Sequence, residues 1–200
     1  DDLVILEPLD FGIDPNQLFG DNIEDLMAQL RNLVGLKDVK KQVSSIMNYV
    51  RAEKRREKMG HPMNDLSLHM VFTGNPGTGK TTIARLISQI LKSIGVLKRG
   101  HMIEVTREDL VGQYVGQTGP KTLEKIKEAY GGVLFIDEAY SLYSASENDF
   151  GYEAISTLIK EMEDNRDKLV VIMAGYPSEM EQMLSMNSGI RSRIAYTVDF

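Results

Sequence analysis

Short apolar segments recur along the chain, and stretches with a helical pattern separate them. The apolar segments lie at 66–73, 101–105, 133–136, 169–174 and 195–200. Apolar runs that do not alternate with polar residues are typical of strands buried on both faces, and such strands occur in parallel sheets. We therefore expect an α/β fold: a five-stranded parallel sheet with helices on both faces.

Apolar residues repeat at intervals of three and four between these strands, which is the spacing of one helix face. The clearest example follows the first strand and consists of Ile83, Leu86, Ile87, Ile90, Leu91 and Ile94. The same spacing predicts a helix at about 21–34 and another from Val39 to Val50, with Gly35 between them.

The beginning of the chain has a different pattern. Residues 1–20 combine the apolar run from Leu3 to Leu6 with scattered proline and glycine, and this mixture predicts an irregular or strand-like segment. We accordingly divide the chain into a lead segment at 1–30 and one large α/β domain at 31–200.

Composition and charge exclude several classes of function. The net charge of −6 argues against a protein that binds nucleic acid mainly through phosphate contacts. No apolar run approaches the roughly 20 residues that span a bilayer, and Asp1 and Asp2 replace the basic start of a signal peptide. The 200 residues include no cysteine, which excludes disulfides and fits a reducing compartment. We expect a cytoplasmic protein without a membrane partner.

A phosphate-binding motif follows the first predicted strand and matches G-x-x-x-x-G-K-[ST]. It consists of Gly74, Asn75, Pro76, Gly77, Thr78, Gly79, Lys80 and Thr81. The glycines allow backbone N–H groups to face phosphate oxygens, and the positive end of the next helix adds to their field. In this motif Lys80 reaches the β- and γ-phosphates, and the Thr81 hydroxyl binds Mg²⁺. The motif therefore predicts ATP and Mg²⁺ as cofactors.

Chance is the alternative explanation of this match. The fixed positions of the motif coincide by accident in roughly one chain in a hundred of this length. The strand before the motif and the helix after it make an accident rarer still, so we favour the functional interpretation.

An acidic pair follows the predicted strand at 133–136. At the end of a buried strand Asp137 can hold Mg²⁺ directly or through water, and Glu138 can polarise the attacking water. Acidic pairs are common at strand ends, so this pair gains its meaning from the phosphate motif. Together the two motifs predict a Mg-dependent ATPase with Lys80 and Glu138 as catalytic residues.

Three stretches of the chain resemble AAA+ ATPases of the CbbX/CfxQ group. These stretches are 74–82, 133–140 and the run Asp-Leu-Val-Gly-Gln-Tyr-Val-Gly-Gln-Thr at 109–118. The group includes the red-type rubisco activases and the stage V sporulation protein K of spore-forming bacteria. The similarity extends from about Leu33 to Phe200, so 31–200 resembles the large nucleotide-binding subdomain of a P-loop NTPase.

The resemblance implies a homo-oligomeric ring, usually a hexamer, with ATP at the subunit interfaces. Its arginine finger corresponds to Arg193, with Arg191 as the second choice, and both arginines could instead be surface charges. The resemblance also adds Thr82 to the nucleotide site and places Val34 and Gly35 against adenine, although a simple helix break explains that segment nearly as well.

Tyr114 corresponds in this group to the aromatic residue of the central pore, where an amphipathic ring grips a polypeptide. Without the resemblance, a packed loop tyrosine is the better interpretation of Tyr114. The chain departs from classical AAA proteins at Tyr176, because those proteins have Asn, Ser or Thr at this strand end to sense the γ-phosphate. It also ends at Phe200, before the helical lid that the resemblance implies.

The leading hypothesis is an ATP-driven ring motor that remodels a protein substrate by threading it through a pore. One alternative is a nucleic-acid-dependent ATPase of the clamp-loader or helicase kind, which the acidic charge disfavours. The other is a nucleotide-dependent binding module with little turnover. The residues do not identify the protein substrate: rubisco and a sporulation target both remain open.

Overall fold

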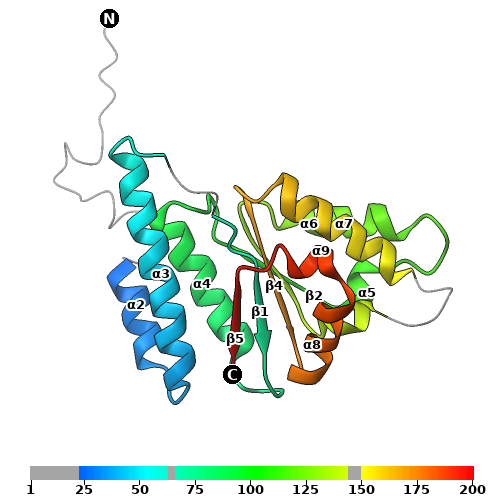
Figure 1. Cartoon of the computed structure of the whole chain (residues 1–200), viewed down its shortest axis with the longest axis horizontal. Coiled ribbons are helices and arrows are strands. Elements are labelled where there is room, and N and C mark those ends of the chain that lie inside the picture. The colour runs from blue at the N-terminus through cyan, green and yellow to red at the C-terminus, as the bar shows by residue number, and fades with distance from the viewer. Residues whose placement is uncertain (1–22, 63–65, 144–149) are drawn as a thin grey trace, which may run out of the picture.

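The computed structural model describes residues 23–62, 66–143 and 150–200. Its centre is a five-stranded sheet in the order β2-β3-β4-β1-β5 (Figure 1). Every neighbouring pair of strands is parallel. The strands are β1 (Met70–Thr73), β2 (Met102–Val105), β3 (Gly132–Ile136), β4 (Leu169–Gly175) and β5 (Tyr196–Asp199). The predicted five-stranded parallel sheet is therefore confirmed.

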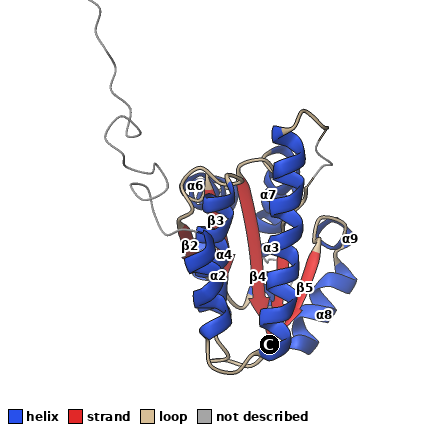
Figure 2. Cartoon of the chain, turned by 90° about the vertical axis from the view of Figure 1, so that its left-hand side faces the viewer, coloured by secondary structure: helices blue, strands red, loops and turns tan. Residues whose placement is uncertain are grey.

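Helices cover both faces of the sheet, as the apolar strands predict (Figures 1 and 2). In the described residues they are α2 (Ile23–Asn32), α3 (Lys37–Lys58), α4 (Lys80–Ile94), α5 (Arg107–Leu110), α6 (Thr118–Glu128), η2 (Ala139–Leu142), α7 (Gly151–Asp164), α8 (Pro177–Met186) and α9 (Ser188–Arg191). The first three pack in one hydrophobic cluster, and α5 to α9 with η2 contribute to the other.

Successive residues of each strand point to opposite faces, so one strand supplies both clusters. In β1, Met70 and Phe72 pack with α2, α3 and α4, whereas Val71 packs with the cluster that contains α7 and α8. All three side chains are fully buried. Burying each one contributes about 1.5–3 kcal/mol relative to exposure, which explains why positions 70–72 of β1 are apolar.

The N-terminal helices belong to the same packed unit as the sheet. Leu26, Met27 and Leu30 of α2 are buried in the cluster that also holds α4. The predicted boundary near residue 31 thus falls at the end of a helix that packs on the domain. Residues 1–22, which make up most of the predicted lead segment, lie outside the described residues.

The strand order brings three strand ends together. Thr73 at the end of β1 is in register with Gly175 of β4, and Ile136 of β3 is in register with Met173. Since β4 lies between β1 and β3, the loops that follow these three strands share one edge of the sheet. Ligands of open parallel sheets bind at this carboxyl edge.

Candidate nucleotide-binding site

The loop between β1 and α4 has backbone angles that favour glycine. Gly74 has a φ of 153° and Gly79 a φ of 95°. A Cβ atom at Gly74 would lie 2.7 Å from Cβ of Phe200, so a larger residue would have to displace Phe200, which directly follows β5. Gly79 caps α4 in the left-handed conformation. These angles turn the loop back over the start of α4, where free helix N–H groups form an anion site.

Lys80 lies at the mouth of this loop. Its Nζ donates to the carbonyl oxygens of Gly74 at 2.8 Å and Asn75 at 2.7 Å. Partial burial lowers the pKa of Lys80, and the negative charge of Asp137 partly opposes that shift. Both acceptors are neutral, and a phosphate oxygen is a stronger acceptor for an ammonium group.

A cavity of about 360 Å³ opens beside this lysine. Its lining joins the phosphate motif to the acidic pair and to the end of β4: Gly74, Pro76, Gly77, Gly79, Lys80, Thr81, Thr82, Asp137, Glu138, Gly175 and Tyr176. The structure therefore brings the predicted catalytic and metal-binding side chains of one subunit to one cavity, with Arg193 as the exception described below.

The acidic pair is held in place by its backbone. The Asp137 N–H donates to Val105 O at 2.9 Å, which extends the pairing between β2 and β3. The Glu138 N–H donates to Oδ1 of Asp137 at 3.0 Å. Glu138 itself has left-handed angles, φ 48° and ψ 46°. Such angles cost a non-glycine residue about 1–3 kcal/mol and cluster at functional sites.

A second cavity of about 420 Å³ lies on the other side of the loop. Its lining is Leu33, Val34, Gly35, Leu36, Gly77, Thr78, Gly79 and Thr82. Val34 is 97% exposed and Leu36 has a left-handed φ of 52°, so this linker presents apolar atoms and backbone to the cavity. The lining includes Val34 and Gly35, the residues predicted to contact adenine, together with Leu33 and Leu36 on either side of them.

Tyr176 lines the phosphate cavity, although its sequence context made a sensing role doubtful. Its ring centroid is 6.0 Å from that of Tyr140 at an interplanar angle of 42°. Burial raises the pKa of Tyr140, and the nearby Glu138 carboxylate raises it further. The Tyr140 phenol therefore stays protonated at neutral pH, and its hydroxyl can donate a hydrogen bond. Tyr140 packs behind Tyr176 and is not itself part of the cavity lining.

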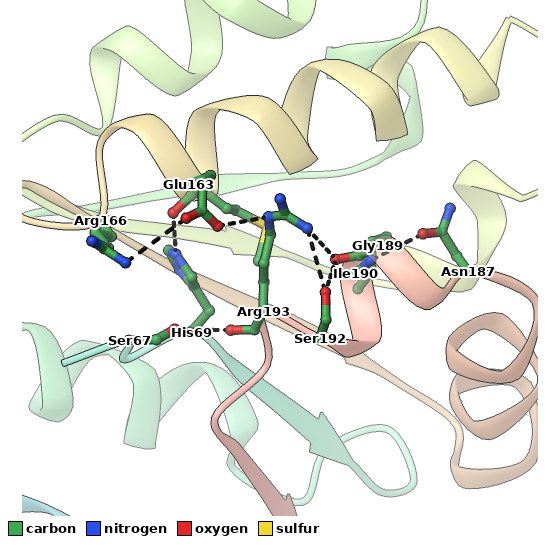
Figure 3. Close-up of polar contacts among 10 residues, drawn as sticks. Ser67, His69, Glu163, Arg166, Asn187, Gly189, Ile190, Ser192 and Arg193 are labelled. Carbon is green, nitrogen blue, oxygen red and sulfur yellow. Dashed lines mark hydrogen bonds and ion pairs between the residues drawn. The ribbon is translucent and has the colours of Figure 1, made fainter. Parts of the chain in front are cut away.

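The two candidate arginine fingers lie away from this cavity. Neither Arg191 nor Arg193 is part of its lining. Arg193 instead contacts Glu163 of α7, with Nε 3.2 Å from Oε2 (Figure 3). Arg191 is exposed at the end of α9, and within the described residues it makes no side-chain hydrogen bond or ion pair.

Tyr114 lies in the loop between α5 and α6 and is 68% exposed. The base of the loop is fixed, because the N–H of Gly112 donates to Oγ1 of the buried Thr118 at 3.0 Å. A Cβ at Gly112 would lie 2.5 Å from Cβ of Gln117, so the two ends of the loop are in close contact. The structure thus presents Tyr114 and the neighbouring Val115 to solvent on a braced loop.

Other chemistry is not apparent in the part of the chain that the structure describes. Those residues contain no cluster of His, Cys, Asp and Glu that could hold a metal ion by itself. His69 is buried and bonded to Met162 O and to the Val171 N–H. None of the described helices is both long enough and apolar enough to cross a membrane.

Comparison with known proteins agrees with this geometry. Residues 70–198 match the model of the ATPase family associated with various cellular activities (AAA). The chain is 52% identical over 185 residues to the chromosomal protein CbxX of Cupriavidus necator, covering 92% of this chain and 58% of that protein. It is 45% identical to stage V sporulation protein K of Bacillus subtilis (strain 168), covering 89% of this chain and 55% of that protein.

A third relative is a chloroplastic ribulose bisphosphate carboxylase/oxygenase activase of Cyanidioschyzon merolae. It is 48% identical over 180 residues, covering 89% of this chain and 61% of that protein. The chain therefore spans little more than half the length of these curated relatives. The family match, the parallel sheet and the relatives agree with one another: the chain belongs to the AAA family of ATPases, and within it to the CbbX/CfxQ group.

Proposed function

We propose that this chain is the nucleotide-hydrolysing core of a ring-forming motor that remodels a protein substrate. The observation that carries the proposal is the cavity in which Lys80 and Thr81 face Asp137 and Glu138. The proposed reaction is Mg-dependent hydrolysis of ATP to ADP and phosphate, and each side chain has a distinct role in it.

The site fits the nucleotide on the geometry of its own residues. The glycine loop, the start of α4 and the Lys80 ammonium offer donors to phosphate oxygens, while Thr81 and Asp137 offer the oxygen ligands that Mg²⁺ prefers. When bound, Mg-ATP supplies the γ-phosphoryl group and a metal ion that neutralises its charge. Glu138 is the base that orients and polarises water.

The cavity lacks one component within its own subunit. Phosphoryl transfer gains about 10³–10⁵-fold from an arginine that stabilises the charge of the transition state. In this subunit no arginine lines the cavity. We therefore assign that role to the neighbouring subunit of a homo-oligomeric ring, a hexamer, with Arg193 as the finger and Arg191 as the second choice.

The exposed loop around Tyr114 supports a polypeptide substrate. An exposed aromatic ring on a braced loop can transmit force to an extended chain, because its apolar face and hydroxyl accept many side chains. One relative is a rubisco activase, and another is a sporulation protein. We propose a protein substrate in the cytoplasm, without choosing between these two targets.

The nucleotide chemistry is tested with Lys80→Ala and Glu138→Gln in the full-length protein. Lys80→Ala should abolish binding of a fluorescent ATP analogue. Glu138→Gln should retain that binding and lower kcat by at least about a hundredfold, because only the step that activates water is lost. Lys92→Ala changes an exposed lysine of the same helix and is the matched control. Hydrolysis that persists in Glu138→Gln would sink the proposed role of this base.

The threading step is tested with Tyr114→Ala. This variant should keep its basal ATPase rate and lose the activation of rubisco, or the unfolding of a tagged model substrate. Tyr49→Ala, which removes a half-exposed tyrosine of α3, is the control. Normal remodelling by Tyr114→Ala contradicts the pore assignment. Stimulation of the ATPase by DNA or RNA would instead favour a nucleic-acid motor, and binding of nucleotide without turnover would favour a switch.

A further inference from the structure

Arg193 is held inside its own subunit by a charge contact with α7 (Figure 3). Its Nε lies 3.2 Å from Oε2 of Glu163, and its Nη1 donates to Gly189 O at 2.9 Å. The guanidinium group is thus directed toward the C-terminal end of α7. In this position its contacts are to groups of its own chain.

The guanidinium is incompletely satisfied in this position. Nε is buried and makes no hydrogen bond, even though the Glu163 carboxylate is 3.2 Å away. Within the described residues Nη2 makes no hydrogen bond either, since every contact of the side chain goes through Nε or Nη1. Buried donors are nearly always paired in folded proteins. The buried, unpaired Nε points to a better acceptor than the subunit itself provides.

The backbone of Arg193 is fixed independently of its side chain. The Ser67 hydroxyl donates to Arg193 O at 2.9 Å, and the Arg193 N–H donates to Ile190 O at 2.9 Å. Release of the guanidinium therefore requires rotation of the side chain alone. The neighbouring imidazole of His69 does not compete for Glu163, because burial lowers its pKa and keeps it neutral.

Glu163 is the partner of Arg193 that a phosphate group can replace. Its side chain is 52% exposed, and its other oxygen lies 3.8 Å from Nη1 of Arg166. A partly exposed ion pair of this kind is weak. Phosphate oxygens bind a guanidinium through two parallel charge-assisted hydrogen bonds, which is a stronger interaction. A γ-phosphate on a neighbouring subunit can therefore displace Glu163.

We propose that Glu163 is a positioning residue that holds Arg193 within the isolated subunit, and that this ion pair breaks when a second copy of the chain presents bound nucleotide. The proposal rests on the proposed function, in which an arginine completes the site of the neighbour. As a consequence, Arg193 stays withdrawn in free subunits. Ring assembly, nucleotide binding and the insertion of Arg193 into the neighbouring site are therefore coupled. Each assembly event then carries the small free-energy cost of opening the pair.

The test uses Glu163→Gln in the full-length protein, with the ATPase rate per subunit measured over a range of protein concentrations. The concentration at half-maximal rate should fall about two- to fivefold, because a larger fraction of subunits has a free finger. Asp164→Asn removes the same charge from the next, exposed position of α7 and should leave the curve unchanged. Arg193→Ala should abolish the rate in either background.

Two results overturn the proposal. If Glu163→Gln leaves the concentration dependence unchanged, the ion pair between Glu163 and Arg193 does not restrain assembly. If Glu163→Gln lowers both the ATPase rate and Tm while Arg191→Ala abolishes turnover, Arg193 is a permanent link between α7 and α9, and Arg191 is the finger. A second readout needs no hydrolysis: sedimentation velocity measures assembly in ATP of Glu138→Gln subunits with and without Glu163→Gln. Glu163→Gln should lower the concentration at half-assembly by the same factor. A wrong assignment of the ATPase residues can therefore be distinguished from a failure of the proposed role of Glu163.

Discussion

The buried histidine directly before β1 should make the fold sensitive to mild acid. The Val171 N–H donates to Nδ1 of His69 at 3.0 Å, so Nδ1 carries no proton and Nε2 donates to Met162 O at 2.9 Å. The residue is 1% exposed. Burial lowers its pKa below the ordinary value of 6.5; the hydrogen bond to Met162 O partly opposes that shift, and the positive charge of Arg193 adds to it. Protonation of Nδ1 would also remove the acceptor of the Val171 N–H.

The sign of the effect follows from linkage. Well above pH 6.5 the histidine is neutral in both states and contributes no pH dependence. As the pH falls through 6.5 the unfolded chain binds more of a proton than the folded chain does, so the free energy of unfolding falls. One such proton gives a limiting slope of about 1.4 kcal/mol per pH unit and a loss of at most about 1 kcal/mol between pH 6.5 and pH 5.5. Carboxylates ionise at lower pH, near 4, and add little in this window.

The assay is urea unfolding followed by circular dichroism between pH 7.5 and pH 5.5. His69→Gln should lower the free energy of unfolding at pH 7.5 by about 1–3 kcal/mol, because the Val171 N–H loses its acceptor. It should also flatten the decline below pH 6.5. The control is His61→Gln, which changes an exposed histidine and should keep the wild-type slope. Equal slopes in wild type and His69→Gln would refute the reasoning.

Three further predictions test other contacts. Gly175→Ala places a Cβ 2.7 Å from the Tyr140 ring and 2.8 Å from Sδ of Met180, so it should cost about 1–3 kcal/mol in urea unfolding and weaken ATP binding in a titration. Ile87→Ala, in the fully buried face of α4, should cost about 2–5 kcal/mol, whereas the exposed Lys92→Ala should cost under about 0.5 kcal/mol. Glu153→Ala removes the acceptor of the Gly119 N–H at 3.0 Å, so hydrogen exchange at the start of α6 should accelerate; unchanged exchange would show that this contact does not hold the helix.

Local patterns were sufficient to predict the sheet and most of the phosphate cavity. Each buried strand is a contiguous run, and the residues from Gly74 to Thr81 and the pair Asp137 and Glu138 directly follow two such runs. Because parallel strands end at one edge, adjacency in sequence was enough to bring them together. The start of β1 was less accurate: the predicted strand began at 66, but ladder pairing begins at Met70.

Strand order explains what the sequence did not reveal. Tyr176 and Tyr140 come together because β4 lies between β1 and β3, and no local pattern encodes that order. The contact of Arg193 with Glu163 likewise joins residues from α7 and from the segment after α9. Such contacts depend on packing between elements far apart in sequence, so they become visible only in the folded chain.

The central claim is that each ATPase site is completed by a neighbouring subunit, and mixing two inactive variants tests it most directly. Glu138→Gln subunits keep Arg193, and Arg193→Ala subunits keep Glu138. In an equimolar full-length mixture about a quarter of the interfaces should combine an intact base with an intact finger, because ring interfaces are heterologous. We predict that the ATPase rate of the mixture clearly exceeds the sum of the two separate rates. A mixture no more active than that sum, with mixed rings present by native mass spectrometry, would contradict the account.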